Sequence, residues 1–325
     1  MLRFLALASF FLRCWSSSDI VTFLLVGDWG GNDLPPYTTP AEVETASSMG
    51  KTAERLSSSF QISLGDNFYH HGVKNVNDPR FRETFENVFD APSLQSTWLV
   101  ILGNHDHYGN ASAQIAYTNV SSRWYLPNYY YTEIYPVGEL GHTLQLVFID
   151  TIILAGLTHP VLRSRPPPGP ASVKQAELQW TWIEETIAKS NATWLLVMGH
   201  YPIWSVCEHG PTQILLDRLK PLLEKYNVSA YLSGHDHCLE HIREEENLVN
   251  YYVVGAGHLT NSSEWHLNDI PSGSLLFNYA PFDPLQIHGG YASVSVTSKE
   301  MKIVFYNSLR DTVLYENIQM NPRRG

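Results

Sequence analysis

Five short segments of the chain place metal-binding residue types directly after apolar runs. The runs cover residues 23–26, 62–64, 99–102, 195–198 and 230–232, and they precede Gly-Asp-Trp-Gly-Gly (27–31), Gly-Asp-Asn-Phe-Tyr (65–69), Gly-Asn-His-Asp (103–106), Gly-His (199–200) and Gly-His-Asp-His (234–237). Short runs rich in Val, Ile, Leu and aromatic residues predict buried strands. Because ligands bind at the carboxyl edge of such sheets, we expect the five segments to meet in one crevice.

The residue types in this crevice predict a pair of metal ions. Two carboxylates, a phenol, an amide oxygen and three imidazoles are too many donors for one tetrahedral ion, but they suit two ions of higher coordination that share a bridge. A phenolate favours a ferric ion, whereas Asn and neutral His favour a divalent one. One such segment alone is more often a plain turn, but five in chain order favour a metal site. The candidate ligands are Asp28, Asp66, Tyr69, Asn104, His200, His235 and His237.

With these motifs the chain resembles the purple acid phosphatases, a family within the calcineurin-like metallophosphoesterases. Further segments resemble the small animal, tartrate-resistant members of that family, among them Arg-Phe-Arg-Glu-Thr-Phe-Glu (80–86) and Glu-His-Gly-Pro-Thr (208–212). The likeness runs from about residue 22 to residue 313. It implies an acid phosphatase that hydrolyses phosphate monoesters with a metal-bound hydroxide at a dinuclear centre. The implied metals are Fe(III) and a divalent ion, which is Fe, Zn or Mn.

The resemblance also implies which residue binds which ion. The ferric ligands are Asp28, Tyr69 and His237, the divalent ligands are Asn104, His200 and His235, and the bridge is Asp66. An extended backbone that separates His235 from His237 by one residue can offer one imidazole to each metal.

Two more histidines match active-site positions of the family, and the resemblance implies that they face the substrate. His105 follows the ligand Asn104, and His209 lies in the loop after His200. An alkoxide leaving group needs a proton and phosphate oxygens need cationic donors, so His105 or His209 is the expected general acid. An imidazolium must be protonated to act, which predicts an acidic optimum. The remaining histidines, including His107 and His258, are interpreted as surface or packing residues.

Composition limits the domain count and the partners. A chain of 325 residues with 44% hydrophobic residues can bury one large core, so residues 19–325 are predicted to form a single catalytic domain. A net charge of −11 argues against nucleic acid, which calls for a basic stripe. The expected partner is a phosphomonoester or phosphoprotein substrate, and we expect a monomer.

The N-terminus is typical of a secretory signal. A basic start at Arg3 and the apolar run 4–12 predict a signal peptide over residues 1–18, with a buried first strand as the alternative. The run is too short to span a bilayer, and no other stretch is long and apolar enough, so we expect a secreted or lysosomal product without a membrane span. Five Asn-x-Ser/Thr sequons predict a glycoprotein, at Asn110, Asn119, Asn191, Asn227 and Asn261.

Cysteine usage differs from that of the family. Its animal members carry a disulfide whose positions are Ala155 and Ile214 here. Once a signal peptide has removed Cys14, only Cys207 and Cys238 remain. We expect them to be two small buried thiols rather than a bridge.

The chain alternates strands with helical stretches. Helices are predicted at 40–58, 81–89, 172–189 and 213–226, and the later apolar segments 251–254, 291–296 and 302–306 suggest a second sheet. By pattern and resemblance the fold class is α/β, a two-sheet β-sandwich flanked by helices, the metallophosphoesterase fold.

The Pro-rich segment 156–171 predicts an exposed, semi-rigid loop. The resemblance implies that it overhangs the metal site and that proteolytic cleavage raises activity, with Arg163 as the expected site for a processing protease. Because no Asp or Glu lies between Asp150 and Glu177, repression by an acidic side chain of this loop is not expected.

Two other functions stay open. A calcineurin-like phosphodiesterase or Ser/Thr phosphatase shares most motifs, but such enzymes usually have His two residues after the first Asp, where this chain has Gly30, and they lack the equivalent of Tyr69. A secreted iron-binding glycoprotein would need neither His105 nor His209.

Overall fold

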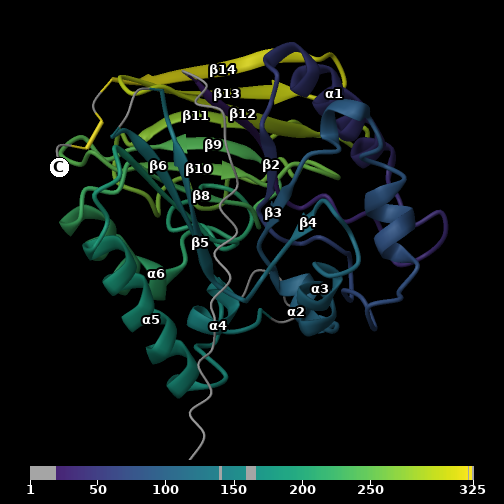
Figure 1. Cartoon of the computed structure of the whole chain (residues 1–325), viewed down its shortest axis with the longest axis horizontal. Coiled ribbons are helices and arrows are strands. Elements are labelled where there is room, and N and C mark those ends of the chain that lie inside the picture. Colours follow the sequence, from purple (N-terminus) through teal and green to yellow (C-terminus); the bar gives the residue numbers. More distant parts are fainter. Residues whose placement is uncertain (1–19, 139–140, 159–165, 321, 324–325) are drawn as a thin grey trace, which may run out of the picture.

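Two seven-stranded mixed sheets form the centre of the computed structural model, which describes residues 20–138, 141–158, 166–320 and 322–323 (Figure 1). The first sheet has the spatial order Thr312–Gln319 (β14), Met301–Asn307 (β13), Gly290–Val296 (β12), Val21–Val26 (β1), Phe60–Ser63 (β2), Trp98–Val100 (β3) and Trp124–Tyr125 (β4). The second has the order Leu275–Tyr279 (β11), Leu239–Ile242 (β9), Asn250–Val254 (β10), Ala230–Ser233 (β8), Trp194–Met198 (β7), Thr143–Phe148 (β6) and Tyr131–Pro136 (β5). The predicted two-sheet sandwich is confirmed.

One expectation about the sheets was wrong. The later strands do not make the second sheet by themselves, because β12 pairs antiparallel with β1 in the first sheet, whereas β10 pairs parallel with β8 in the second. Strand periodicity shows which residues are buried but carries no information on which strand becomes the neighbour.

Alternation along the strands builds two apolar layers. In β7, Leu196 and Met198 face the core between the sheets, while Leu195 and Val197 face outward under helices. The outer layer is closed by apolar residues of α5 (Val173–Ala188) and α6 (Gln213–Lys225), such as Ile183 and Leu219. Buried on both faces, β7 reads as a continuous apolar run.

Helices begin and end close to their predicted bounds. Thr39 caps α1 (Pro40–Leu56) in a capping box with Glu42, and Ser172 caps α5. The predicted helix at 81–89 is a short π-helix, Phe81–Glu86. Four short helices were not predicted, namely Pro92–Leu94 (a 3₁₀ turn), Asn104–Tyr108 (α2), Ala111–Tyr117 (α3) and Thr151–Ala155 (α4).

The carboxyl ends of the parallel strands meet across the two sheets. β1, β2 and β3 run parallel in the first sheet, and β6, β7 and β8 run parallel in the second. The Gly27 N–H after β1 donates to the Val254 carbonyl at the end of β10 (2.8 Å). This bond joins the carboxyl-end edges of the two sheets, so the loops that follow the strands of both sheets lie next to one another.

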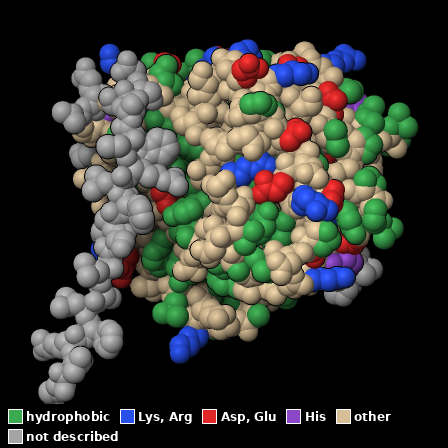
Figure 2. Space-filling view, turned by 45° about the vertical axis from the view of Figure 1, so that its right-hand side comes forward, with side chains coloured by type: hydrophobic (Ala, Val, Ile, Leu, Met, Phe, Trp, Pro, Cys, Tyr) green, Lys and Arg blue, Asp and Glu red, His purple; other side chains and the backbone are tan. Residues whose placement is uncertain are grey.

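On the face displayed in Figure 2, Lys and Arg side chains stand singly among acidic and uncharged ones. Such a surface does not offer the continuous basic stripe that nucleic-acid binding calls for. Among the described residues, the helices are all too short or too polar to cross a membrane. The predicted signal peptide lies outside the described residues.

Candidate metal centre

The structure brings all seven predicted ligand residues to the shared edge of the two sheets. They follow β1, β2, β3, β7 and β8, and each is at most 9% exposed. The seven are Asp28, Asp66, Tyr69, Asn104, His200, His235 and His237.

Three of these side chains form one group of donor atoms. The Tyr69 hydroxyl donates to Asp28 Oδ1 (2.8 Å), and its oxygen lies 3.1 Å from His237 Nε2. His237 Nε2 lies 3.7 Å from Asp28 Oδ1. A carboxylate, a phenol and an imidazole therefore converge on one point.

A second group surrounds Asp66. Donor atoms of Asp66, His200 and His235 lie within 4.8 Å of one another. His200 Nε2 lies 3.1 Å from Asn104 Oδ1 and 3.4 Å from Asp66 Oδ2. His200 Nδ1 donates to the Leu64 carbonyl (2.9 Å), which turns Nε2 toward the group.

The backbone at this edge is held in left-handed conformations. Asp28 has φ 58°, Asp66 has φ 52° and His235 has φ 72°, a region that non-glycine residues rarely adopt. A Cβ at Gly103 would collide with the Asp66 carboxylate, so only glycine permits this approach. The strained ligand positions and the close packing indicate that the loops are shaped for the site rather than for stability.

Asp106 positions two of the ligand loops without being a candidate ligand. Its carboxylate accepts from the backbone N–H groups of Gly103 (2.8 Å) and Asn67 (3.1 Å), and from the Gln114 amide (2.8 Å). These bonds join the segment of Asp66 to the segment of Asn104, so the two arrive as one rigid unit.

The buried carboxylates make the site a place for positive charge. Burial, with the nearby Asp66 adding to it, raises the pKa of Asp28 well above its usual range. Burial also opposes ionisation of Asp66, but the neighbouring His200 and His105 outweigh it and hold its pKa well below the usual range. Burial is likewise outweighed at His200, where Asp66 and Asp28 raise the pKa to about 9.

Two imidazoles and the phenol are neutral in this environment. Burial, together with neighbouring histidines, lowers the pKa of His235 and of His237 well below 6.5, which leaves each ring with a lone pair for a metal. Burial and the carboxylates of Asp28 and Asp66 raise the pKa of Tyr69 well above 10, so its phenolate form needs a strongly charged cation beside it.

This donor set fits two metal ions. One group holds carboxylate, phenol and imidazole, the other holds carboxylate, amide oxygen and two imidazoles, and buried carboxylates of this kind require a compensating cation. Asp66 has one oxygen 3.4 Å from His200 in the second group, and its charge also acts on Asp28 and Tyr69 in the first. Asp66 therefore interacts with residues of both groups.

The two predicted substrate-facing histidines lie at the rim of the same site. His105 Nδ1 bonds to the His70 carbonyl (2.7 Å), and its Nε2 lies 3.9 Å from Asp66 Oδ2. The ring of His209 stacks on the ring of His235 with centroids 4.2 Å apart. Both rings are therefore beside the ligand groups.

His258 is a packing residue, as interpreted from the sequence, but sequence reasoning did not place it beside the candidate ligands. It is buried, its ring stacks on Tyr69 with centroids 4.1 Å apart, and its Nδ1 bonds to the Asp28 carbonyl (2.6 Å). Burial lowers the pKa of His258 to about 3, so the ring is a neutral wall behind two candidate ligands. A signal was present in the sequence, because the apolar segment 251–254 is followed by Gly255, Ala256 and Gly257 and then by His258. His107, also interpreted as a packing residue, bonds to the buried Asp150 (2.8 Å).

The expectation of two free thiols was wrong. The structure pairs Cys207 with Cys238 in a disulfide that spans a sequence separation of 31 residues. The two cysteines sit in different loops, and only the tertiary fold brings these loops together. Sequence spacing alone could not show it.

The base of the Pro-rich loop is fixed beside the site. The Tyr201 hydroxyl donates to the Gly156 carbonyl (3.2 Å) and the Tyr108 hydroxyl to the Thr158 carbonyl (2.7 Å). The ring of Tyr201 lies 4.5 Å from that of His235. The expected cleavage site at Arg163 lies outside the described residues.

Comparison with known proteins agrees with this architecture. The calcineurin-like phosphoesterase family matches residues 21–239. GAP50, described as the anchor in the inner membrane complex of Plasmodium, superposes with a TM-score of 0.75 at 22% identity, over 94% of this chain and 90% of that one. At that identity the likeness concerns the fold alone.

Closer sequence relatives are phosphatases. Tartrate-resistant acid phosphatase type 5 of Homo sapiens is 43% identical over 290 residues, which cover 89% of this chain and 88% of the human protein. Purple acid phosphatase 4 of Arabidopsis thaliana is 32% identical over 293 residues, 88% of this chain and 80% of the plant protein. The chain belongs to the purple acid phosphatases of the calcineurin-like phosphoesterase family. It is therefore a hydrolase, an acid phosphatase.

Proposed function

We propose that the chain hydrolyses phosphate monoesters, including those of phosphoproteins, at a dinuclear centre of Fe(III) and a divalent metal. The observation that carries this proposal is the pair of donor groups at one sheet edge, with Asp66 a member of the second group that also acts on Tyr69 of the first. Within a phosphoesterase fold, such a pair suits a phosphoryl group whose oxygens need two cations.

The ligand assignment follows the chemistry of each donor group. The group with the phenol of Tyr69 suits the ferric ion, because a phenolate is a hard anionic donor, and this gives it Asp28 and His237 as well. The group with the amide of Asn104 suits a divalent Fe, Zn or Mn, with His200 and His235. When bound, two such ions supply positive charge to the phosphoryl oxygens and lower the pKa of a water.

The histidines at the rim handle the proton and the substrate. The bond from His105 Nδ1 to the His70 carbonyl fixes that ring and leaves Nε2 to face the bridge region. His209 is held flat against His235 and can present a proton to the leaving-group oxygen. General acid catalysis requires the imidazolium, so activity is expected to fall as the catalytic histidine loses its proton.

The biological setting is proposed from the sequence and the family. Residues 1–18 are a signal peptide, residues 19–325 form the catalytic domain, and the glycosylated monomer is secreted or lysosomal. A processing protease acts at the 156–171 loop.

Two alternatives remain distinguishable by experiment. A secreted iron-binding glycoprotein would contain iron but lack phosphatase turnover, and a calcineurin-like phosphodiesterase would prefer a diester. Tyr69 and the paired rim histidines favour the monoesterase over both.

The test combines elemental analysis with kinetics of the purified protein. We expect two metal ions per chain, one of them iron, and a higher kcat/KM for 4-nitrophenyl phosphate than for bis(4-nitrophenyl) phosphate. His209→Ala should keep both metals and lose about 10²–10⁴-fold in kcat for an alkyl phosphate, the range for general acid catalysis. One metal per chain, a preference for the diester, or loss of metal from His209→Ala would each contradict the proposal.

A further inference from the structure

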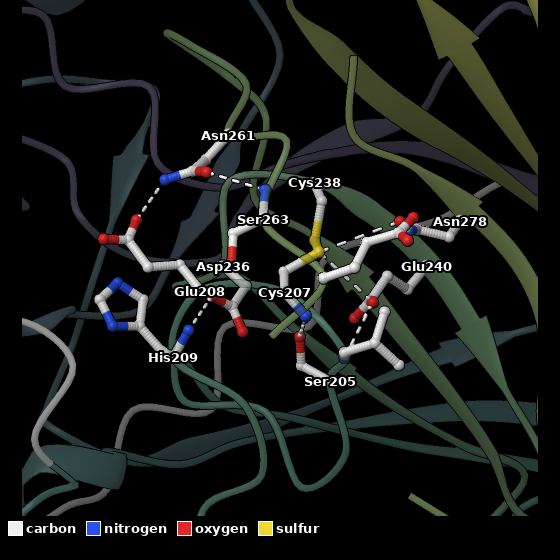
Figure 3. The surroundings of a disulfide bond; sticks show 12 residues. Ser205, Cys207, Glu208, His209, Asp236, Cys238, Glu240, Asn261, Ser263 and Asn278 are labelled. Carbon is white, nitrogen blue, oxygen red and sulfur yellow. Dashed lines mark hydrogen bonds between the residues drawn. A yellow bond between two sulfur atoms is a disulfide. The ribbon is translucent and has the colours of Figure 1, made fainter. Parts of the chain in front are cut away.

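Four ties fasten the loop that carries His209 onto the segment that follows the candidate ligand His235, and Figure 3 shows two of them, the disulfide and the bond from His209 to Asp236. The backbone N–H groups of His209 and Gly210 donate to the two carboxylate oxygens of Asp236 (2.8 and 3.2 Å). The Val206 N–H donates to Glu240 Oε1 (3.0 Å). The fourth tie is the disulfide between Cys207 and Cys238.

All of the anchoring side chains are fully buried. Asp236, Glu240 and both cysteines have 0% exposure. Hydrogen bonds in a buried, low-dielectric setting are stronger than at the surface, and water cannot replace them when they break. The loop of His209 is therefore held rigidly against the segment that follows His235, unlike a loop that lies free on the surface.

The ties act at the positions that matter for chemistry. Asp236 lies between His235 and His237, and Cys238 directly follows His237. On the other segment, Cys207 lies two residues before His209. Each tie thus connects the ligand segment to the neighbourhood of the rim histidine, and the His209 ring ends up 4.2 Å from the His235 ring.

We propose that the Cys207–Cys238 disulfide and the Asp236 carboxylate are positioning elements that hold His209 at a fixed place over the metal pair. They act through His209 and touch neither metals nor substrate. The inference rests on the proposed role of His209 as the proton donor to the leaving group. In this proposal the bridge supports catalysis by positioning His209. It lies at other positions than the family's usual bridge, whose two positions are Ala155 and Ile214 here.

A misplaced proton donor has a specific kinetic signature. A good leaving group departs without a proton, whereas a poor one depends on it, so misplacement of His209 penalises alkyl phosphates more than activated aryl phosphates. A merely structural loosening of the metal site would slow both substrates alike.

The main variant is Cys207→Ser with Cys238→Ser, measured as the metal-loaded full-length enzyme on an alkyl phosphate and on 4-nitrophenyl phosphate. We expect kcat for the alkyl phosphate to fall about 10- to 100-fold and kcat for the aryl phosphate less than about threefold, with KM and metal content unchanged. Asp236→Asn replaces one accepting oxygen by an NH₂ group and keeps the bridge, so it should show the same selective loss even if the serine variant folds poorly.

Trp204→Phe serves as the matched control. It removes the indole bond to Glu244 (2.8 Å) from the same segment, away from the Asp236 contacts, and should affect both substrates equally. Equal losses for both substrates in the serine variant and in Asp236→Asn, or no loss in either, would overturn the inference.

His209→Ala separates this inference from the proposed function. If His209 is the general acid, His209→Ala alone shows the selective loss on alkyl phosphate, and adding the serine substitutions to it causes no further selective loss. If His209→Ala shows the selective loss, but the two serine substitutions cause the same further loss in His209→Ala as in the wild type, only the positioning role is refuted. If His209→Ala shows no selectivity, the role of His209 as proton donor and the positioning inference both fail, whereas the proposed monoesterase function still stands or falls on the metal content and the preference for the monoester.

Discussion

Acidification should destabilise this protein through one buried histidine that lies away from the candidate ligands. His241 on β9 is fully buried and its ring stacks on Tyr252, with centroids 4.4 Å apart. Its Nε2–H donates to Asn250 Oδ1 (2.9 Å), so the neutral ring accepts at Nδ1 from the Tyr315 hydroxyl (2.9 Å). A second ring proton would place an unpaired charge between the sheets.

The structure sets the size and the sign of the effect. Burial, helped by the nearby Arg243, lowers the pKa of His241 to about 4, compared with about 6.5 in an unfolded chain. Because the unfolded chain binds the proton more readily, the contribution of His241 to the free energy of unfolding is fully present above pH 6.5 and is lost as the pH falls toward 4. With a pKa of about 4 in the folded protein and about 6.5 in the unfolded chain, proton linkage lowers the free energy of unfolding by about 2 kcal/mol between pH 7 and pH 5.

The assay is urea unfolding of the metal-loaded protein at pH 7 and pH 5, compared with His241→Phe. That variant lacks the hydrogen bonds of His241 at both pH values, so their loss does not depend on pH. Because Phe cannot titrate, the decrease in the free energy of unfolding from pH 7 to pH 5 should be about 2 kcal/mol smaller in the variant than in the wild type. Tyr315→Phe keeps the histidine and should retain the wild-type pH dependence. Identical pH dependence in the wild type and His241→Phe would refute the reasoning.

Three further predictions concern the site and its loop. Phenolate-to-iron(III) charge transfer from Tyr69 should colour the oxidised protein, so Tyr69→Phe should remove that colour, and an unchanged spectrum would exclude Tyr69 as a ligand. Asp66→Ala should lose both metals, whereas Asn104→Ala should lose mainly the divalent one; elemental analysis showing two ions in Asp66→Ala would argue against a bridge. Limited trypsin cleavage at Arg163 should raise kcat/KM for a phosphoprotein more than for an aryl phosphate, because a loop over residues 156–171 excludes large substrates most. A large, equal rise for both would show that the loop blocks the metals themselves.

Predictions from sequence worked where a pattern is local. The run 195–198 is apolar throughout, and it forms β7, buried on both faces. The predicted helical stretches 40–58 and 172–189 form α1 and α5, which the structure shows to be capped by Thr39 and Ser172. Local chemistry also identified the ligand candidates, because an acidic, phenolic or imidazole side chain after a strand is visible in the sequence.

Predictions failed where the outcome depends on packing between distant segments. β12 belongs to the first sheet because its backbone groups pair with those of β1. The periodicity of a strand does not specify its pairing partner. His258 lies far along the chain from Asp28 and Tyr69, and only the fold places its ring against them. The Cys207–Cys238 bridge formed for the same reason.

The sequence by itself therefore determined the strands, the main helices and the set of donor side chains, because alternation, capping and residue chemistry act over a few neighbouring residues. The tertiary structure decided how those donors divide into two groups around Asp66, which neighbours shift the pKa of each, and how the loop of His209 is tied to the ligand segment. Distances of a few ångströms between side chains from both sheets set these properties, and such distances arise only when the two sheets pack together.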